Sequence, residues 1–138
     1  MPQPKVLSAL TEADCWSRLR SVPVGRIGYI EGDVPVIRLV NFSVRRGDIV
    51  IWTVPGGCGS SVAGQFVAFE VDQVDPRSRS GWTVLAVGAA EAVTNVEELV
   101  AVTDFPRRPW VAERNDQVNR IRVDRISGLQ LPAPPATP

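Results

Sequence analysis

Alternation of apolar and polar residues with a period of two, repeated in six runs, constrains the fold of this chain most. Short segments rich in glycine, aspartate and proline separate the runs and favour turns. Because successive side chains of a strand point to opposite faces, each run predicts a strand with one buried face. The predicted strands span residues 25–30, 34–42, 48–53, 66–74, 82–94 and 118–131.

Three short segments carry helical signals instead. Thr11 is a suitable N-cap, acidic residues follow it, and an apolar stripe with helical spacing continues until Pro23. A short helical turn is predicted over residues 61–65, although Gly64 weakens it. Asn95 is expected to cap a third helix that runs to about residue 102.

This pattern predicts a mainly β fold, a six-stranded antiparallel barrel with short flanking helices, because closure removes the exposed edges of a sheet. Gly88, midway along its run, indicates a bulge or bend in the barrel wall. A length of 138 residues suits one such domain. We expect an N-terminal segment at residues 1–10, the barrel domain at residues 11–131 and a proline-rich flexible tail at residues 132–138.

Charge and hydropathy argue against several partners. Fifteen basic residues balance fifteen acidic ones, so no net field favours nucleic acid or anionic lipid. The longest apolar run, residues 83–90, is far shorter than the roughly 20 residues of a membrane span. The first ten residues do not resemble a signal peptide, and two cysteines do not indicate a disulfide framework. We therefore expect a cytoplasmic protein, and the excess of arginine over lysine suggests the genome of a GC-rich bacterium.

Histidine is absent, which narrows the possible chemistry. A Ser-His-Asp or Cys-His hydrolase cannot be assembled, and no metal site is indicated. No catalytic residue can be named from the sequence. If the chain is an enzyme, we expect a bound organic cofactor to carry the reaction.

Five blocks, in order, resemble the pyridoxamine 5′-phosphate oxidase-like proteins. They lie at residues 24–28, 35–42, 67–72, 81–84 and 108–110. The resemblance implies a split β-barrel homodimer that binds FMN at the subunit interface and oxidises or reduces a small molecule. A deazaflavin is the alternative cofactor in some relatives. The substrate is not indicated by any motif.

The resemblance also implies site residues. Val40 and Asn41 match positions that border the flavin ring, and Thr53 matches a hydroxyl position near the phosphate or ribityl chain. Trp110 matches a position from which the partner's flavin would be covered. Each has a structural alternative: Asn41 could end a strand, Thr53 could be an ordinary strand residue, and Trp110 could pack in a core or interface.

The loop after Thr53 departs from the family pattern. Family members usually carry Gly-Ser-Lys-Leu, whereas this chain reads Gly59-Ser60-Ser61-Val62 and lacks the lysine. Ser60 and Ser61 can still donate hydrogen bonds to a phosphate, and Arg38 is the best replacement cation. The alternative is that Arg38 is a solvated surface residue. In that case FMN binding would be altered or lost.

Other conspicuous side chains are expected to be structural. Glu70 lies in an apolar strand and should face solvent or pair with Arg26 or Arg120. Trp16 and Trp82 are predicted to pack. Cys58, in the glycine-rich loop, is a candidate exposed thiol.

Three functional interpretations follow. The first is an FMN-dependent oxidoreductase, because the flavin supplies the redox chemistry that a histidine-free chain lacks. The second is a flavin- or deazaflavin-binding protein without turnover. The third is a dimeric interaction module that has lost its cofactor, which the missing lysine favours.

Overall fold

The computed structural model describes residues 7–53, 62–95, 97–98 and 117–131. Within these ranges the chain forms one antiparallel sheet, in the order β1-β7-β4-β3-β2-β5-β6, and pairing of β6 with β7 closes six of the strands into a barrel. The mainly β barrel prediction is confirmed. The strands are β1 (Ser8–Ala9), β2 (Val24–Glu31), β3 (Val34–Arg45), β4 (Asp48–Thr53), β5 (Phe66–Asp75), β6 (Ser80–Ala92) and β7 (Gln117–Leu131).

Two tight hairpins build the first half of the barrel, as the turn residues predict. Gly32 and Asp33 join β2 to β3 with φ angles of 53° and 68°. Arg46 and Gly47 join β3 to β4 with φ angles of 50° and 80°. Two consecutive residues of positive φ match the twist of the adjoining strands, which is why glycine and aspartate are favoured there.

The long strands β6 and β7 complete the barrel through a predicted irregularity. Their register shifts between Val87 and Gly88. A Cβ at Gly88 would overlap the carbonyl oxygen of Arg122 on β7, so only glycine allows the two backbones to approach this closely. The bulge predicted at Gly88 is confirmed.

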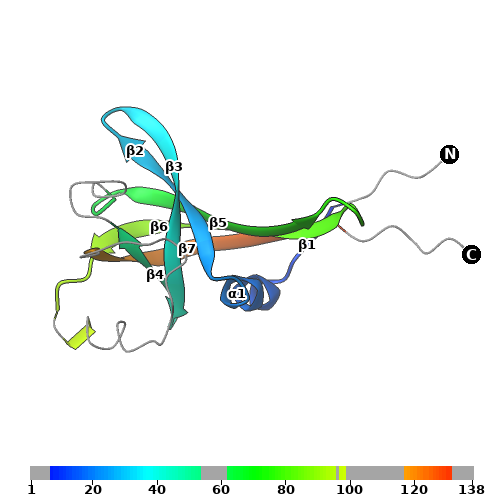
Figure 1. The fold of residues 1–138 in the computed structure, drawn as a ribbon. Helices are drawn as coiled ribbons and strands as arrows, with labels where there is room; N and C mark the ends of the chain where they lie inside the picture. The colour runs from blue at the N-terminus through cyan, green and yellow to red at the C-terminus, as the bar shows by residue number, and fades with distance from the viewer. Residues whose placement is uncertain (1–6, 54–61, 96, 99–116, 132–138) are drawn as a thin grey trace, which may run out of the picture.

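Helix α1 (Glu12–Arg20) lies beside the part of the barrel that carries β1 (Figure 1). The Thr11 hydroxyl accepts a hydrogen bond from the Asp14 amide at 3.1 Å, which confirms the predicted cap. Cys15 and Leu19 face the core and are fully buried. Beneath them the inner face is filled by apolar side chains, among which the Phe42 and Phe69 rings meet edge to face at 4.9 Å.

Of the two other predicted helices, the first is a turn instead, and the described start of the second agrees with its predicted Asn95 cap. Residues 62–65 form a turn closed by the Gln65 amide donating to Val62 O, and Gly64 has φ +88°, which a helix does not allow. Glu97 and Glu98 are helical, and their amides donate to Asn95 Oδ1 at 2.8 and 3.3 Å. The rest of that predicted helix lies outside the described residues. No helix within the described ranges is long and apolar enough to cross a membrane.

Candidate functional site

Strand β3 carries three of the predicted site residues. Val40 and Asn41 are both buried. Val40 belongs to the inner core, and its neighbour Asn41 therefore points to the outer side of the barrel wall, because successive side chains of a strand alternate between its faces. Arg38, two residues before Val40, faces inward as well, but it lies nearer the β2–β3 turn and its side chain is 38% exposed.

Arg38 has an incomplete set of hydrogen-bond partners. Its Nη2 atom lies 3.6 Å from Glu31 Oε2, and its Nη1 atom donates to Ile37 O at 3.4 Å. Its Nε atom is buried and has no partner within the described part of the chain. A buried N–H without an acceptor costs about 1–3 kcal/mol, so the surroundings of Arg38 suit an additional acceptor. Arg38 is therefore partly solvated, with 38% of its side chain exposed and one donor buried.

Thr53 ends β4 and is bonded across the sheet to a residue that the sequence analysis did not identify. Asn119, on β7, donates from Nδ2 to Thr53 Oγ1 at 3.1 Å, and both side chains are buried. Because the threonine oxygen acts as the acceptor, its own hydroxyl hydrogen is available to another group. Asn119 lies two residues before the buried Ile121 and therefore faces inward on β7. A polar residue at such an inward position is the sequence feature that could have identified it.

Gln65 fixes the chain that follows the glycine-rich loop. Its side chain pairs with the backbone of Ile30 as a neighbouring strand would: Nε2 donates to Ile30 O at 2.7 Å, and the Ile30 amide donates to Oε1 at 2.9 Å. On the other side, the Gly64 amide donates to Ala90 O, and the Ala90 amide donates to Gln65 O, both at 2.8 Å. The turn at residues 62–65 is thereby held against the hairpin that carries Arg38.

Three of the predicted site residues lie near one another along the strands but not on one face. Asn41 pairs in register with Trp52, the neighbour of Thr53, and Arg38 lies three residues away on β3. Asn41 points to the outer side of the wall, whereas Thr53 and Arg38 lie at inward positions. Ser60, Ser61, Trp110 and Cys58 lie outside the described residues.

The outer face of β3, β2, β5 and β6 is largely apolar. Leu39, Arg26, Glu70 and Leu85 are successive partners across the four strands, and Ile37, Gly28, Ala68 and Val87 form the next row. Ile37 is 67% exposed and Leu39 51% exposed. The small residues Gly28 and Ala68 leave a shallow depression at the centre of the second row. The exposed side chains of Ile30 and Phe66 extend the apolar surface beyond this row.

A small ionic group interrupts this apolar face. Arg26 Nη1 lies 3.1 Å from Asp72 Oδ2 and 3.4 Å from Glu70 Oε1, which confirms the predicted pairing of Glu70 with Arg26. The Thr83 hydroxyl also donates to Glu70, at 3.3 Å. Burial, followed by the neighbouring Asp72 carboxyl, raises the pKa of Glu70, and the Arg26 charge opposes the shift only in part.

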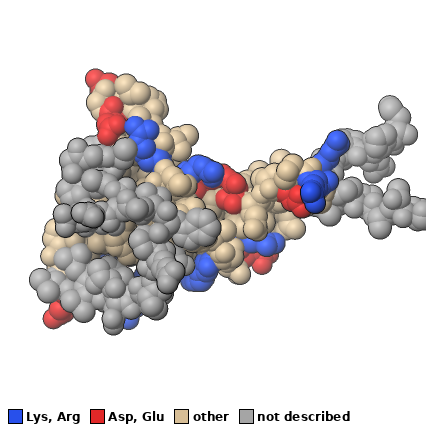
Figure 2. Space-filling model, viewed as in Figure 1, with Lys and Arg blue, Asp and Glu red and all other residues tan. Residues whose placement is uncertain are grey.

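Arg120, the other partner considered for Glu70, lies in a second ionic group. Its Nε atom and that of Arg122 each lie 2.7 Å from Glu91 Oε1, and Arg120 also contacts Glu98 at 3.1 Å. On the face seen in Figure 2 acidic and basic side chains are interspersed. Among the described residues no three acidic or cysteine side chains are grouped to hold a metal ion.

Comparisons with known proteins give a consistent result. Residues 11–130 match the sequence model of the pyridoxamine 5′-phosphate oxidase family. Rv0080, an uncharacterized protein of Mycobacterium tuberculosis, is 36% identical over 126 residues, which cover 87% of this chain and 82% of that protein.

Two solved structures are similar in fold and sequence. The FAD-binding protein of Mycobacterium smegmatis has a TM-score of 0.78 and 28% identity, covering 90% of this chain and 98% of that one. A candidate pyridoxamine 5′-phosphate oxidase of Corynebacterium glutamicum has a TM-score of 0.75 and 28% identity, covering 95% and 96%.

Proposed function

This chain belongs to the pyridoxamine 5′-phosphate oxidase family, and on that premise we propose that it is a homodimeric flavin-binding oxidoreductase that acts on a small molecule. FMN is the proposed cofactor. The Nε of Arg38, buried and without a partner among the described residues, is the observation that carries the proposal, because this chain lacks the family's usual loop lysine and a phosphate needs another cationic donor.

The residues around Arg38 fit a flavin phosphate. A phosphate monoester carries close to two negative charges at neutral pH and several strong acceptor oxygens. The Arg38 guanidinium would supply the charge, and Ser60 and Ser61 would add hydroxyl donors. Gln65 would help to keep this group together, because it ties the end of the glycine-rich loop to the hairpin that bears Arg38.

The remaining site residues have distinct roles in this proposal. Asn119 orients the Thr53 hydroxyl so that its hydrogen is available to the ribityl chain or phosphate. Val40 and Asn41 would border the ring, with Trp110 covering it from the partner subunit. When bound, the flavin supplies hydride transfer at its ring, so the protein needs to position the cofactor and substrate and to exclude water.

The absorption spectrum of the purified protein tests cofactor binding directly. We expect flavin bands, or their appearance after incubation with FMN and removal of excess ligand. Parallel incubation with FAD distinguishes a site for the terminal phosphate of FMN from one that accepts the larger dinucleotide. A colourless protein that neither flavin reconstitutes would contradict the proposal. Bound flavin that no reductant or electron acceptor turns over would support the binding protein without turnover.

The apolar outer face of β3, β2, β5 and β6 is the proposed dimer interface. Exposed Ile37, Leu39 and Phe66 are too concentrated on one face for an ordinary solvated surface. An obligate twofold interface buries more than about 2,000 Å² in total. In sedimentation velocity, the wild-type chain should be a dimer and Leu39→Glu a monomer. The control Leu7→Glu, at an equally exposed residue outside the sheet, should remain a dimer.

The cofactor-free dimeric module is the second candidate, because the glycine-rich loop lacks the lysine that relatives usually place against the phosphate. This candidate predicts the same dimer but no binding of FMN, FAD or a deazaflavin. The spectrum and the sedimentation experiment together therefore separate the two functions.

A further inference from the structure

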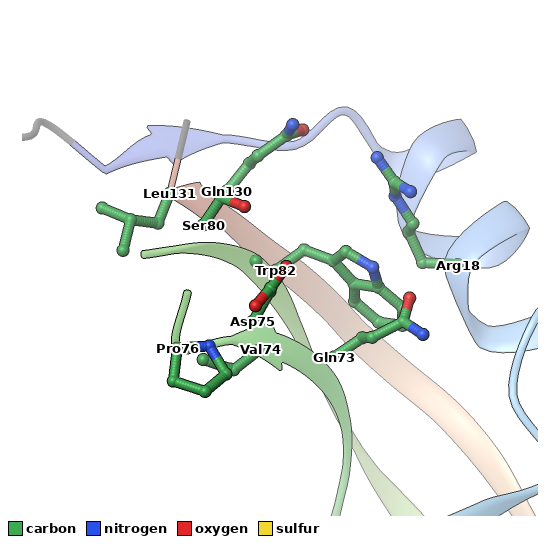
Figure 3. Close-up of a pocket in the computed structure, with 10 residues that line it drawn as sticks. Arg18, Gln73, Val74, Asp75, Pro76, Ser80, Trp82, Gln130 and Leu131 are labelled. Atoms are coloured by element: carbon green, nitrogen blue, oxygen red, sulfur yellow. The ribbon is translucent and has the colours of Figure 1, made fainter. Parts of the chain in front are cut away.

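A groove of 610 Å³ lies at the end of the barrel that carries α1, far from Thr53. Along β7, Gln117 pairs with Thr53, whereas Gln130 pairs with Trp82 in the groove. At about 3.3 Å per strand residue, the two places are separated by roughly 40 Å of strand. Figure 3 shows the groove running from Arg18 of α1 to Pro76 and Leu131.

The floor of the groove is a row of three side chains on neighbouring strands. Trp82 of β6 pairs in register with Gln73 of β5 on one side and with Gln130 of β7 on the other, so the three side chains point to the same face. The preceding row on this face, Val71, Val84 and Gly128, is apolar and belongs to the covered core. The next row on the same face carries the carboxamides of Gln73 and Gln130, which lie outside the covered core and do not contribute to its packing.

Arg18 covers this row from the helix. Its Cζ atom lies 5.5 Å from the centroid of the Trp82 ring. A cation at this distance over an aromatic ring is attracted by the negative face of the ring, which helps to hold the guanidinium beside Trp82. Among the described residues Arg18 forms no ion pair. The groove thus contains a cation that lies against an aromatic ring and that no described acidic side chain pairs with.

Asp75 sets a limit on the charge of a ligand. It lines the same groove near the β5–β6 turn, and its Oδ1 accepts the Arg77 amide at 2.9 Å. This hydrogen bond helps to fix the carboxylate in place. A ligand with one carboxylate can pair with Arg18, whereas a second carboxylate toward Asp75 would be repelled.

We propose that the groove binds a small organic monocarboxylate. Its carboxylate pairs with the edge of the Arg18 guanidinium, which matches the two oxygens of such a group. Its remaining polar groups, amides or hydroxyls, bond to Gln73 and Gln130, which each offer a donor and an acceptor. Pockets at barrel mouths with an apolar wall and a few convergent polar groups are common ligand sites.

N-acetyl-L-alanine is a suitable probe, because it has one carboxylate and one amide. Its binding to the full-length protein can be followed in ¹H–¹⁵N NMR spectra through the Trp82 indole and the Gln73 and Gln130 carboxamide signals. We expect saturable shifts of these signals. The neutral N-acetyl-L-alaninamide should bind at least about tenfold more weakly, since it lacks the charge that Arg18 recognises.

Variants on α1 test the role of Arg18. Arg18→Gln should weaken binding of N-acetyl-L-alanine about tenfold or more and should reduce the preference of the protein for this acid over the neutral amide. Arg20→Gln, on the same helix, should change neither the affinity nor the preference. If Arg18→Gln lowers the melting temperature, Arg18→Lys retains the charge without the planar fork and should still bind the acid more weakly than wild type does. Equal affinities for acid and amide, no saturable shift, or unchanged binding by both Arg18 variants would overturn the proposal.

Discussion

Replacing Arg38 by methionine should increase the stability of the cofactor-free protein while it weakens flavin binding. Methionine retains an unbranched apolar stem but removes the buried Nε, whose missing acceptor costs about 1–3 kcal/mol. The same change loses the contact with Glu31 at 3.6 Å, an exposed ion pair worth about 0–1 kcal/mol. The net gain in free energy of unfolding should be on the order of 1 kcal/mol, or roughly 3–5 °C in melting temperature.

Bound flavin should reverse the sign of this effect. A hydrogen bond between a guanidinium and a phosphate is worth about 1.5–3 kcal/mol, so Arg38→Met should lower the affinity for FMN about tenfold to more than a hundredfold. Urea unfolding of the cofactor-free protein measures the first quantity, and quenching of flavin fluorescence during titration measures the second. Arg77→Met, in the β5–β6 turn, is the control and should change neither by more than about 0.5 kcal/mol. A destabilised cofactor-free variant, or an unchanged dissociation constant for FMN, would refute the reasoning.

Three further predictions concern other parts of the chain. Gly88→Ala should lower the free energy of unfolding by more than about 3 kcal/mol in urea, because its Cβ would overlap the backbone of β7; a loss below about 1 kcal/mol would show that the strands can separate there. Because the pKa of Glu70 is raised on folding, its contribution to stability is complete below its unfolded pKa and is lost as pH rises through the folded pKa. Glu70→Gln should therefore gain stability relative to wild type by a few tenths of a kcal/mol between pH 4 and pH 7, and parallel stability curves would contradict this. Ser61→Lys should strengthen FMN binding about fivefold at low salt, from a Coulomb gain on the order of 1 kcal/mol, and the gain should shrink as salt is added to the titration.

Local sequence determined the features whose partners are close along the chain. The Thr11 cap bonds to an amide three residues away, and the two hairpin turns need only residues that accept positive φ. Strand positions follow from alternation, because burial of one face is recorded in every second residue. Gly88 could be identified as an irregularity from its place in a long strand, although the β7 carbonyl that excludes a side chain there could not.

The tertiary structure decided which distant groups meet. Asn119 and Thr53 are 66 positions apart, and Gln65 reaches Ile30 across 35 positions. The two rows of the outer apolar face, and the groove residues Gln73, Trp82 and Gln130, became neighbours only when strand order and register were fixed. The missing partner of Arg38 Nε likewise depends on everything that surrounds it in space. Hydrogen bonding and burial are properties of three-dimensional neighbours, and residue spacing along the chain specifies those neighbours only within a helix turn or a hairpin.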